Sequence, residues 1–313
     1  MQSVGGRGPD ASVHSIGPTW PRPPCPQCGY ESSLALWGQD RNRWTTKERF
    51  AYYRCGSCRL LFLWPIPEQL EAFYPEDYYA IPRSIDDVGM EAQAQRPNLE
   101  LILRFVRTGR LLEIGPAYGA FAHAAKLAGF EVDTIEMDGR CCRFLEEQVG
   151  VRAYHSSDPA IVVQDLATYD VVAMWQVIEH LADPWSLLDI LPKHVSSGGI
   201  LVIAAPNPEA WQFLLFGGRW THVDAPRHLQ LIPIRVLVER LERQGLMLRH
   251  RTMSDPVSIG WGRFGWQWSL ANMAKSKSAR SLFRILGAVL GRTLGPLEAA
   301  AGRGAAYTLV LRR

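Results

Sequence analysis

The stretch LLEIGPAYGAFAHAA, residues 111–125, decides the fold of this chain. Its apolar run ends at Glu113, two glycines follow at Gly115 and Gly119, and the sequence then becomes rich in alanine. This order is typical of a buried strand that passes through a tight turn into the N-terminus of a helix. Such a helix end directs free N–H groups at its ligand. The stretch therefore predicts a site for a nucleotide-like molecule.

Apolar strands and amphipathic helices alternate on both sides of this turn. Strands are expected over residues 111–115, 131–136, 151–154, 170–175, 200–205, 246–253 and 305–313, and helices over residues 98–109, 118–130, 138–150, 183–195 and 233–246. Buried strands separated by helices indicate a largely parallel sheet that is covered on both faces. The sequence therefore predicts a doubly wound, Rossmann-like α/β fold.

The length of 313 residues accommodates one large domain and a small one. We expect a mobile tail over residues 1–24, a metal-binding module with its connector over residues 25–80, a ligand-binding domain over residues 81–252 and 304–313, and an inserted helical cap over residues 253–303. The connector contains Tyr74, Tyr78 and Tyr79. These tyrosines either line a cleft between the modules or pack their interface, and packing is favoured.

Four of the six cysteines form two C-x-x-C pairs, Cys25 with Cys28 and Cys55 with Cys58. Each pair can present two thiolates to one tetrahedral ion, and the intervening segment can form a β-hairpin. The pattern predicts a zinc ribbon. Disulfides or a redox motif are disfavoured, because no export signal is seen and a redox motif would not normally occur twice. A site closed by four thiolates holds structure and leaves no open position for chemistry.

The glycine turn fits a nicotinamide fingerprint poorly, because alanines, Ala117 and Ala120, occupy two of its three glycine positions. The run E-x-G-x-x-x-G instead resembles the first motif of the class I S-adenosylmethionine-dependent methyltransferases, which usually carry a glycine at the position of Ala117. The segments DVVAMWQVIEHLADP and SSGGILVIAAPNP resemble later motifs of that family. Within the first of them, Glu179-His180-Leu181 followed by Asp183-Pro184 resembles a branch that includes ubiquinone-type O-methyltransferases and sugar methyltransferases. An alanine at position 117 is expected to fit, since the position needs little volume.

The resemblance implies where S-adenosylmethionine binds. The expected cofactor residues are Glu113, Gly115, Ala117 and Gly119 at the turn, Glu136 at the ribose hydroxyls, Ser157 and Asp158 at the adenine amino group, and Trp175 and Gln176 at the end of the fourth strand. A carboxylate such as Glu136 has two oxygens with which to accept hydrogen bonds from both ribose hydroxyls. For the Trp175 side chain two positions are expected as alternatives: facing the sulfonium or adenine, or packed in the core.

Methyl transfer is an in-line displacement, so the protein mainly positions the nucleophile and removes a proton. His180 is the candidate base because imidazole titrates near neutral pH, with a structural cap as the alternative. Glu179 is expected to orient His180 or to bind a substrate hydroxyl, and His228 is expected to contact the substrate or to act as a second base. A second metal site at His222, Asp224 and His228 is disfavoured.

The chain is basic and aromatic from residue 251 onward. That region is a solvated helical face, or it contacts phosphate-bearing substrates or a membrane surface through residues 253–303. We expect a cytoplasmic enzyme that methylates a small molecule or glycan at oxygen. The alternatives are a sugar C-methyltransferase, which would need a further domain, a nicotinamide oxidoreductase and a catalytically silent binding protein. Nucleic acid is not an expected partner, because the net charge of +3 is modest.

Overall fold

The computed structural model of this chain describes residues 21–274 and 276–313, so most of the predicted tail lies outside the described residues. The central sheet has the strand order β10-β11-β8-β7-β4-β5-β6. Its strands are β4 (Gly109–Ile114), β5 (Phe130–Glu136), β6 (Arg152–His155), β7 (Tyr169–Trp175), β8 (Val195–Pro206), β10 (Met247–Thr252) and β11 (Ala306–Arg312). The five strands from β8 to β6 are parallel, and β11 runs antiparallel to both of its neighbours. This arrangement confirms the predicted Rossmann-like fold.

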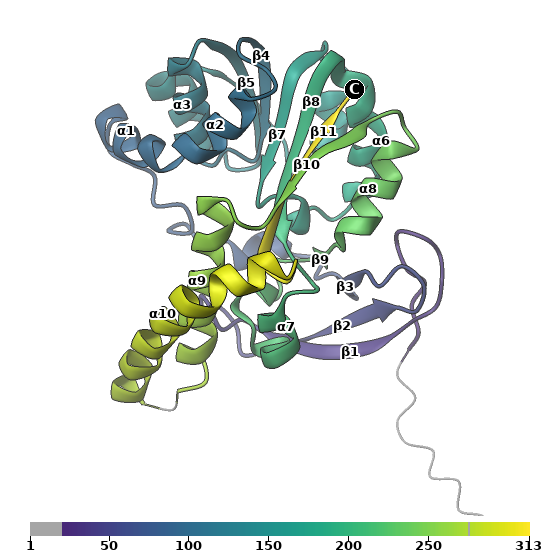
Figure 1. The fold of residues 1–313 in the computed structure, drawn as a ribbon, viewed down its shortest axis with the longest axis vertical. Helices are drawn as coiled ribbons and strands as arrows, with labels where there is room; N and C mark the ends of the chain where they lie inside the picture. The colour runs from purple at the N-terminus through teal and green to yellow at the C-terminus, as the bar shows by residue number, and fades with distance from the viewer. Residues whose placement is uncertain (1–20, 275) are drawn as a thin grey trace, which may run out of the picture.

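Helices cover both faces of the sheet (Figure 1). They are α1 (Ile85–Ala94), α2 (Arg96–Leu103), α3 (Ala120–Leu127), α4 (Gly139–Phe144), α5 (Pro159–Val163), α6 (Pro184–His194) and α8 (Ile234–Glu242). Two apolar clusters lie in the core: Leu112 and Val172 belong to one, and Leu111 and Val171 belong to the other. Because neighbouring residues of β4 and β7 are buried in different clusters, these strands read as continuous apolar runs.

The strand order reverses between β4 and β7, since the chain builds β5 and β6 on one side of β4 and β7 and β8 on the other. Parallel sheets of this kind bind ligands at the carboxyl ends of the strands next to such a reversal. Three aspartates that follow the carboxyl ends of these strands then start helices: the side chains of Asp138, Asp158 and Asp183 accept N–H groups in the first turns of α4, α5 and α6.

The cysteine-bearing segment forms a second sheet with the order β1-β2-β3-β9. Strands β1 (Ser32–Gln39) and β2 (Arg49–Cys55) make the hairpin between the two cysteine pairs, followed by β3 (Leu61–Leu63). The fourth strand, β9 (Gln230–Leu231), lies between β8 and β10 in the sequence, yet it pairs with β3. The two sheets are therefore joined by a strand that the sequence did not predict.

Helices α9 (Pro256–Ala271) and α10 (Lys277–Ala300) form a hairpin between β10 and β11 that projects from the body of the protein (Figure 1). This hairpin is the predicted helical insertion before the last strand. None of the helices in the described ranges is long and apolar enough to cross a membrane. The remaining short helices are η1 (Leu70–Phe73), η2 (Leu145–Val149), η3 (Ile178–His180), α7 (Trp211–Phe216), η4 (Gly217–Arg219) and η5 (Thr221–Val223).

Candidate active site

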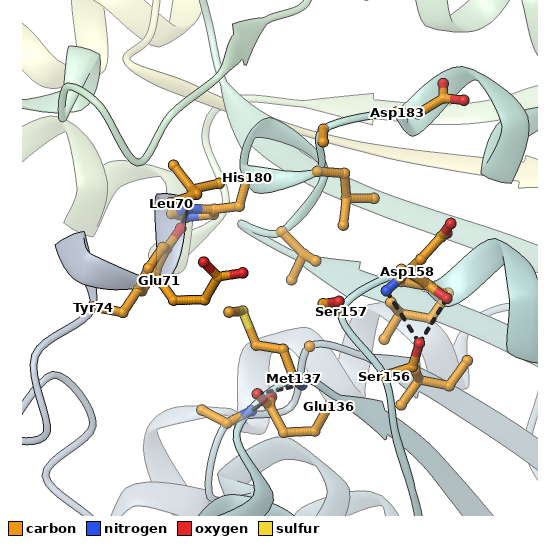
Figure 2. A pocket seen from close by; sticks show the side chains of 18 of the residues that line it. Leu70, Glu71, Tyr74, Glu136, Met137, Ser156, Ser157, Asp158, His180 and Asp183 are labelled. Carbon is orange, nitrogen blue, oxygen red and sulfur yellow. Dashed lines mark hydrogen bonds between the residues drawn. The ribbon is translucent and has the colours of Figure 1, made fainter. Parts of the chain in front are cut away.

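A cavity of about 550 Å³ lies at the carboxyl ends of the parallel strands (Figure 2). The predicted residues that line it are Gly115, Ala117, Glu136, Ser157, Asp158, Trp175, Gln176 and His180. They come from four separate segments of the chain, one at the end of each of β4, β5, β6 and β7. The fold therefore gathers most of the predicted cofactor residues around one space large enough for a nucleoside-sized ligand.

The turn after β4 is left-handed at three positions, with φ of +72° at Gly115, +53° at Ala117 and +89° at Gly119. The left-handed conformation of Ala117 explains why a glycine is usual at this position. A residue with a Cβ atom pays roughly 1 kcal/mol for left-handed backbone. The Ala117 N–H donates to Glu136 Oε2 over 2.9 Å, and this hydrogen bond helps to hold the turn.

Glu136 ends β5 and is 2% exposed. Its Oε1 accepts the N–H groups of Met137 at 2.8 Å and Asp138 at 2.9 Å, and its Oε2 accepts that of Ala117. Burial raises the pKa of this carboxyl above its usual range, and these backbone hydrogen bonds oppose the rise. Each carboxylate oxygen can accept more than one hydrogen bond, so Glu136 can still receive hydroxyl donors from the cavity.

Ser157, Asp158, Trp175 and Gln176 occupy the walls on either side of Glu136. Asp158 also caps α5, because its Oδ1 accepts the N–H of Ala160 over 3.0 Å. Trp175 lines the cavity and contacts Phe121 edge to face, with ring centroids 5.2 Å apart. The indole therefore lies at the cavity wall and packs against a core residue, and its place facing the sulfonium stays a prediction.

Glu113 and Gly119 do not line this cavity. Gly119 is the N-cap of α3, where a Cβ atom would lie 2.5 Å from Leu145 Cδ2. Glu113 is 3% exposed, and burial raises the pKa of its carboxyl to about 8, with the charge of Glu136 adding to the rise. Both residues therefore lie at the ends of the turn, away from the cavity wall.

The connector covers the cavity opposite the strands. Figure 2 shows Leu70, Glu71 and Tyr74 on this side, and Tyr78 and Tyr79 also line the wall. The three tyrosines contact one another in sequence order, with ring centroids 4.8 and 4.9 Å apart. They line a cleft and pack an interface at once, although packing alone was favoured from the sequence.

A second cavity of about 420 Å³ adjoins the first, and Tyr78, Gln176 and His180 line both. Its other walls are Asn42 and Arg43 from the β1–β2 loop, Glu179 after β7, Thr221, His222, Asp224 and His228 from the loop after β8, and Trp261, Phe264 and Trp268 from α9. Of these, Asn42, Arg43 and the α9 aromatics were missed by sequence reasoning. Nothing in their local pattern places them beside the end of β7.

Three polar groups meet where the two cavities join. Ligand atoms of Glu179, His180 and His228 all lie within 4.8 Å of one another, and the two imidazole rings are perpendicular with centroids 4.5 Å apart. Neither carboxyl oxygen of the buried Glu179 has a hydrogen-bond partner among the described residues. The group is close enough to hold a hydroxyl-bearing acceptor, and the same donor set could hold a divalent cation. The disfavoured combination of His222 and Asp224 with His228 is not such a cluster.

The tautomer of His228 follows from its surroundings. His228 Nδ1 lies 2.8 Å from the carbonyl oxygen of His222, and a carbonyl oxygen only accepts, so Nδ1 carries the hydrogen. In the neutral ring Nε2 is then a free base. Burial lowers the pKa of His228, which keeps the ring neutral. His180 Nδ1 lies 3.1 Å from the Tyr74 hydroxyl, and burial followed by the nearby His228 lowers the pKa of His180 to about 3.

Glu179 is the acidic residue in the group that it forms with His180 and His228. Burial raises the pKa of its carboxyl to about 8, so the protonated form predominates at neutral pH. A protonated carboxyl can donate one hydrogen bond as well as accept. The join between the cavities therefore offers one free imidazole base and one buried carboxyl to the same bound group.

A buried ion-pair network supports the second cavity. Arg227 Nη2 lies 2.7 Å from Asp40 Oδ1 and 2.7 Å from Asp224 Oδ1, and the Arg227 and Asp40 side chains are fully buried. Burial opposes ionisation of Asp224, but its hydrogen bonds with Arg227 prevail and lower its pKa to about 2. Asn42 Nδ2 also donates to Asp224 Oδ1 over 2.6 Å. The network ties the β1–β2 loop to the loop after β8.

The four predicted metal ligands, Cys25, Cys28, Cys55 and Cys58, come together in one cluster with all sulfur atoms within 4.8 Å. Cys25 Sγ lies 3.6 Å from Cys58 Sγ, and Cys28 Sγ lies 3.5 Å from Cys55 Sγ. A tetrahedral site with Zn–S bonds near 2.3 Å places its sulfur atoms about 3.8 Å apart. The four free thiols therefore fit a zinc ion. The Cys25–Cys58 and Cys28–Cys55 sulfur atoms are too far apart for disulfide bonds, which need about 2.05 Å.

The fold and these cavities define an α/β enzyme that binds a nucleoside-type cofactor at the carboxyl edge of its sheet. Residues 90–251 match the family model described as a methyltransferase domain, and the chain belongs to this family. It is a class I S-adenosylmethionine-dependent methyltransferase. Family membership disfavours the nicotinamide alternative.

Individual relatives are distant. The chain is 26% identical over 173 residues to a ubiquinone biosynthesis O-methyltransferase of Ruegeria sp. (strain TM1040), covering 52% of this chain and 68% of that relative. A solved structure of coclaurine N-methyltransferase bound to N-methylheliamine and SAH is similar with a TM-score of 0.50 and 14% identity, over 79% of this chain and 83% of that one. A candidate sarcosine dimethylglycine methyltransferase from Galdieria sulphuraria also gives 0.50, with 12% identity, over 78% and 98%. At these low identities, the two structures show only that the fold is similar.

Proposed function

We propose that this enzyme transfers the methyl group of S-adenosylmethionine to a hydroxyl of a small-molecule or glycan acceptor. The observation that carries the proposal is the join between the two cavities, where the buried Glu179 carboxyl and a free imidazole nitrogen face one space. Within the part of the chain that the structure describes, that carboxyl has no hydrogen-bond partner. The first cavity receives the cofactor and the second receives the acceptor. His180, which lines both, marks the boundary that the methyl group crosses. The ubiquinone O-methyltransferase relatives support transfer to oxygen.

The residues have distinct roles in this proposal. Glu136 binds the ribose hydroxyls, and Ser157 and Asp158 contact the adenine. Glu179 and His180 hold the acceptor hydroxyl, and His228 Nε2 removes its proton as oxygen attacks the methyl carbon and the thioether leaves. Aromatic side chains of α9 provide flat faces against which an acceptor ring can pack. We also propose that the four cysteines hold one structural Zn²⁺.

The acceptor atom can be tested without knowing the acceptor. The enzyme is incubated with S-adenosylmethionine carrying a ¹³C methyl group and a small-molecule extract, with and without added Mg²⁺. Methyl carbons bonded to oxygen and to carbon resonate in separate regions of the NMR spectrum. A labelled O-methyl product supports the proposal, whereas a C-methyl product favours the sugar C-methyltransferase alternative. Cofactor binding without any labelled product favours the silent binding protein.

Glu136→Ala is expected to weaken S-adenosylmethionine binding roughly 10- to 100-fold. Hydrogen bonds to a charged group contribute about 1.5–3 kcal/mol each, and about 1.4 kcal/mol corresponds to a factor of ten. Isothermal titration calorimetry measures the effect directly. Glu131→Ala removes an exposed carboxylate from the same strand and is the matched control, with affinity expected to stay within about twofold of wild type. Unchanged affinity in Glu136→Ala would show that the ribose is bound elsewhere.

His228→Ala is expected to lower the turnover number at least about 100-fold, because general-base catalysis typically contributes that much or more. Cofactor affinity should stay within about twofold of wild type, since His228 does not line the first cavity. His250→Ala on β10, away from both cavities, is the control. If His180→Ala abolishes turnover and His228→Ala does not, the base is His180 instead.

A further inference from the structure

Helix α10 presents its large apolar side chains to the outside of the protein. Leu282 is 62% exposed, Ile285 65%, Leu286 46% and Val289 51%. Their spacing of three and four residues places them on one face of the helix, which we call the outer face of α10. A continuous exposed apolar face of this kind is unusual on a protein surface and marks an interaction site.

The packing of α10 explains why this face is free. The helix contacts α9 through glycines: a Cβ atom at Gly287 would lie 2.6 Å from Gln267 Cα, and one at Gly291 would lie 2.9 Å from Arg263 Cα. On the same inner side, Glu298 Oε1 accepts the Trp266 indole N–H over 3.0 Å. These contacts hold the inner side of α10 against α9, and the four apolar side chains of the outer face stay exposed.

The charges of the hairpin have one sign at its surface. Between residues 256 and 303 the basic residues are Arg263, Lys275, Lys277, Arg280, Arg284, Arg292 and Arg303, and the single acidic residue is Glu298. Glu298 is 1% exposed, and it is bonded to Trp266 and Gln212. Among the described residues of the hairpin, the charged groups that are not buried are therefore all cations. Arg292 borders the outer face of α10, whereas Arg280 and Arg284 lie toward Trp268 of α9. An amphipathic helix with this composition is typical of one that lies in a membrane interface.

A second apolar group adjoins the C-terminal end of α10. Trp211, Leu214 and Leu215 of α7 are 42%, 68% and 65% exposed, and Leu297 of α10 is 58% exposed. The start of α7 is tied to the turn that follows α10, because the N–H of Trp211 donates to the carbonyl oxygen of Arg303 over 3.1 Å. The exposed apolar residues thus continue from α10 onto α7.

We propose that the outer face of α10 docks on a membrane surface that contains anionic lipids. The apolar side chains enter the boundary between head groups and acyl chains, and the positive charge of the hairpin attracts the anionic lipids. No described helix can span the bilayer, so the hairpin lies in the interface. A second copy of this chain is the poorer occupant, because pairing through this face brings the cations of the two hairpins together.

Docking through α10 would also affect which acceptors can reach the second cavity. Helix α9, to which α10 is packed, contributes Trp261, Phe264 and Trp268 to the second cavity. The guanidinium groups of Arg280 and Arg284 lie 5.7 and 5.0 Å from the Trp268 ring. Docking would hold this cavity close to the lipid surface, which suits an acceptor carried on a lipid. This last step rests on the proposed function, whereas membrane binding itself does not.

Flotation of the full chain with vesicles tests the docking. The vesicles are pure phosphatidylcholine, or phosphatidylcholine with about one third phosphatidylglycerol to supply anionic charge. We expect wild type to float with the anionic vesicles and to be released by high salt. The combined variant Leu282→Gln, Ile285→Gln and Leu286→Gln should partition at least about tenfold less. Its S-adenosylmethionine affinity should equal that of wild type, which shows that the protein is folded and tests the cofactor site separately.

The matched control removes three exposed apolar side chains elsewhere, in the combined variant Met90→Gln, Leu127→Gln and Met247→Gln, whose side chains are 68%, 73% and 54% exposed. It should float like wild type. The proposal is overturned if wild type stays unbound, if the α10 variant floats equally well, or if neutral and anionic vesicles bind alike. It is also overturned if light scattering finds a dimer that the α10 variant dissociates while no vesicle binding occurs.

Discussion

Replacing Arg227 by methionine is expected to lower the free energy of unfolding by about 3–5 kcal/mol at neutral pH, because it leaves buried carboxylates without a cation. The Arg227 and Asp40 side chains are fully buried, and Asp224 is 13% exposed. The guanidinium also donates to the carbonyl oxygen of Phe73 over 3.3 Å. Urea unfolding followed by circular dichroism measures the loss. Arg235→Met removes an exposed ion pair with Glu239 and should change stability by less than about 0.5 kcal/mol.

The effect of Arg227→Met should depend on pH in a defined direction. In wild type the pKa of Asp224 is lowered to about 2, so the stability it contributes is present above an unfolded pKa of about 3.9 and is lost as pH falls through about 2. In the variant, burial without Arg227 raises the pKa of both carboxyls. The folded variant then binds more protons than the unfolded chain, and its stability falls as pH rises. The deficit should therefore be largest near neutral pH and shrink toward pH 4.

A second variant separates charge from packing. Adding Asp40→Asn and Asp224→Asn to Arg227→Met removes the uncompensated charges, and we expect it to recover a substantial part of the lost stability. A deficit that is equal at pH 4.5 and pH 7.5, or that the asparagines leave unchanged, would mean that Arg227 acts through its volume alone. The test matters for function, because this network fixes the loop that carries Asn42 into the second cavity.

The residues that gather around the first cavity could be predicted from the sequence because their signals are local. Gly115 and Gly119 stand where left-handed backbone is needed, and Glu136 ends a strand that pairs directly with β4. The cysteine pairs are equally local, since each C-x-x-C forms within four residues. In these cases a short stretch of sequence fixes both the conformation and the direction of the side chain.

The second cavity could not be predicted from the sequence because it is assembled from distant segments. Arg227 and Asp40 are 187 residues apart, and Asn42 and Asp224 are 182 apart. The two-residue strand β9 has no pattern of its own, and it forms only because β3 offers an edge. The orientation of α10 could not be predicted for another reason. A face rich in leucine normally packs against the protein, whereas in α10 Gly287 and Gly291 contact α9 and the apolar face is exposed.

Loss of the zinc ligand in Cys55→Ser is expected to unfold the ribbon and to abolish methyl transfer. Structural zinc binding contributes about 10–16 kcal/mol in zinc-finger peptides at neutral pH, and such modules are unfolded without metal. The ribbon reaches the second cavity through Tyr52, whose hydroxyl donates to the carbonyl oxygen of His228 over 2.7 Å. Unfolding of β2 therefore frees the loop that presents His228. We expect turnover to fall more than about 100-fold, as for loss of the base itself.

Cofactor binding should respond less than turnover to the loss of zinc. Glu136, Gly115 and Asp158 belong to the central sheet and its helices, and only the connector side of the first cavity depends on the ribbon. Metal analysis of wild type should return about one zinc ion per chain, as four thiolates require. Cys141→Ser, a buried cysteine outside the cluster, should keep its zinc and its turnover. A Cys55→Ser protein that lacks zinc and still methylates at the wild-type rate would show that the ribbon does not position the acceptor site.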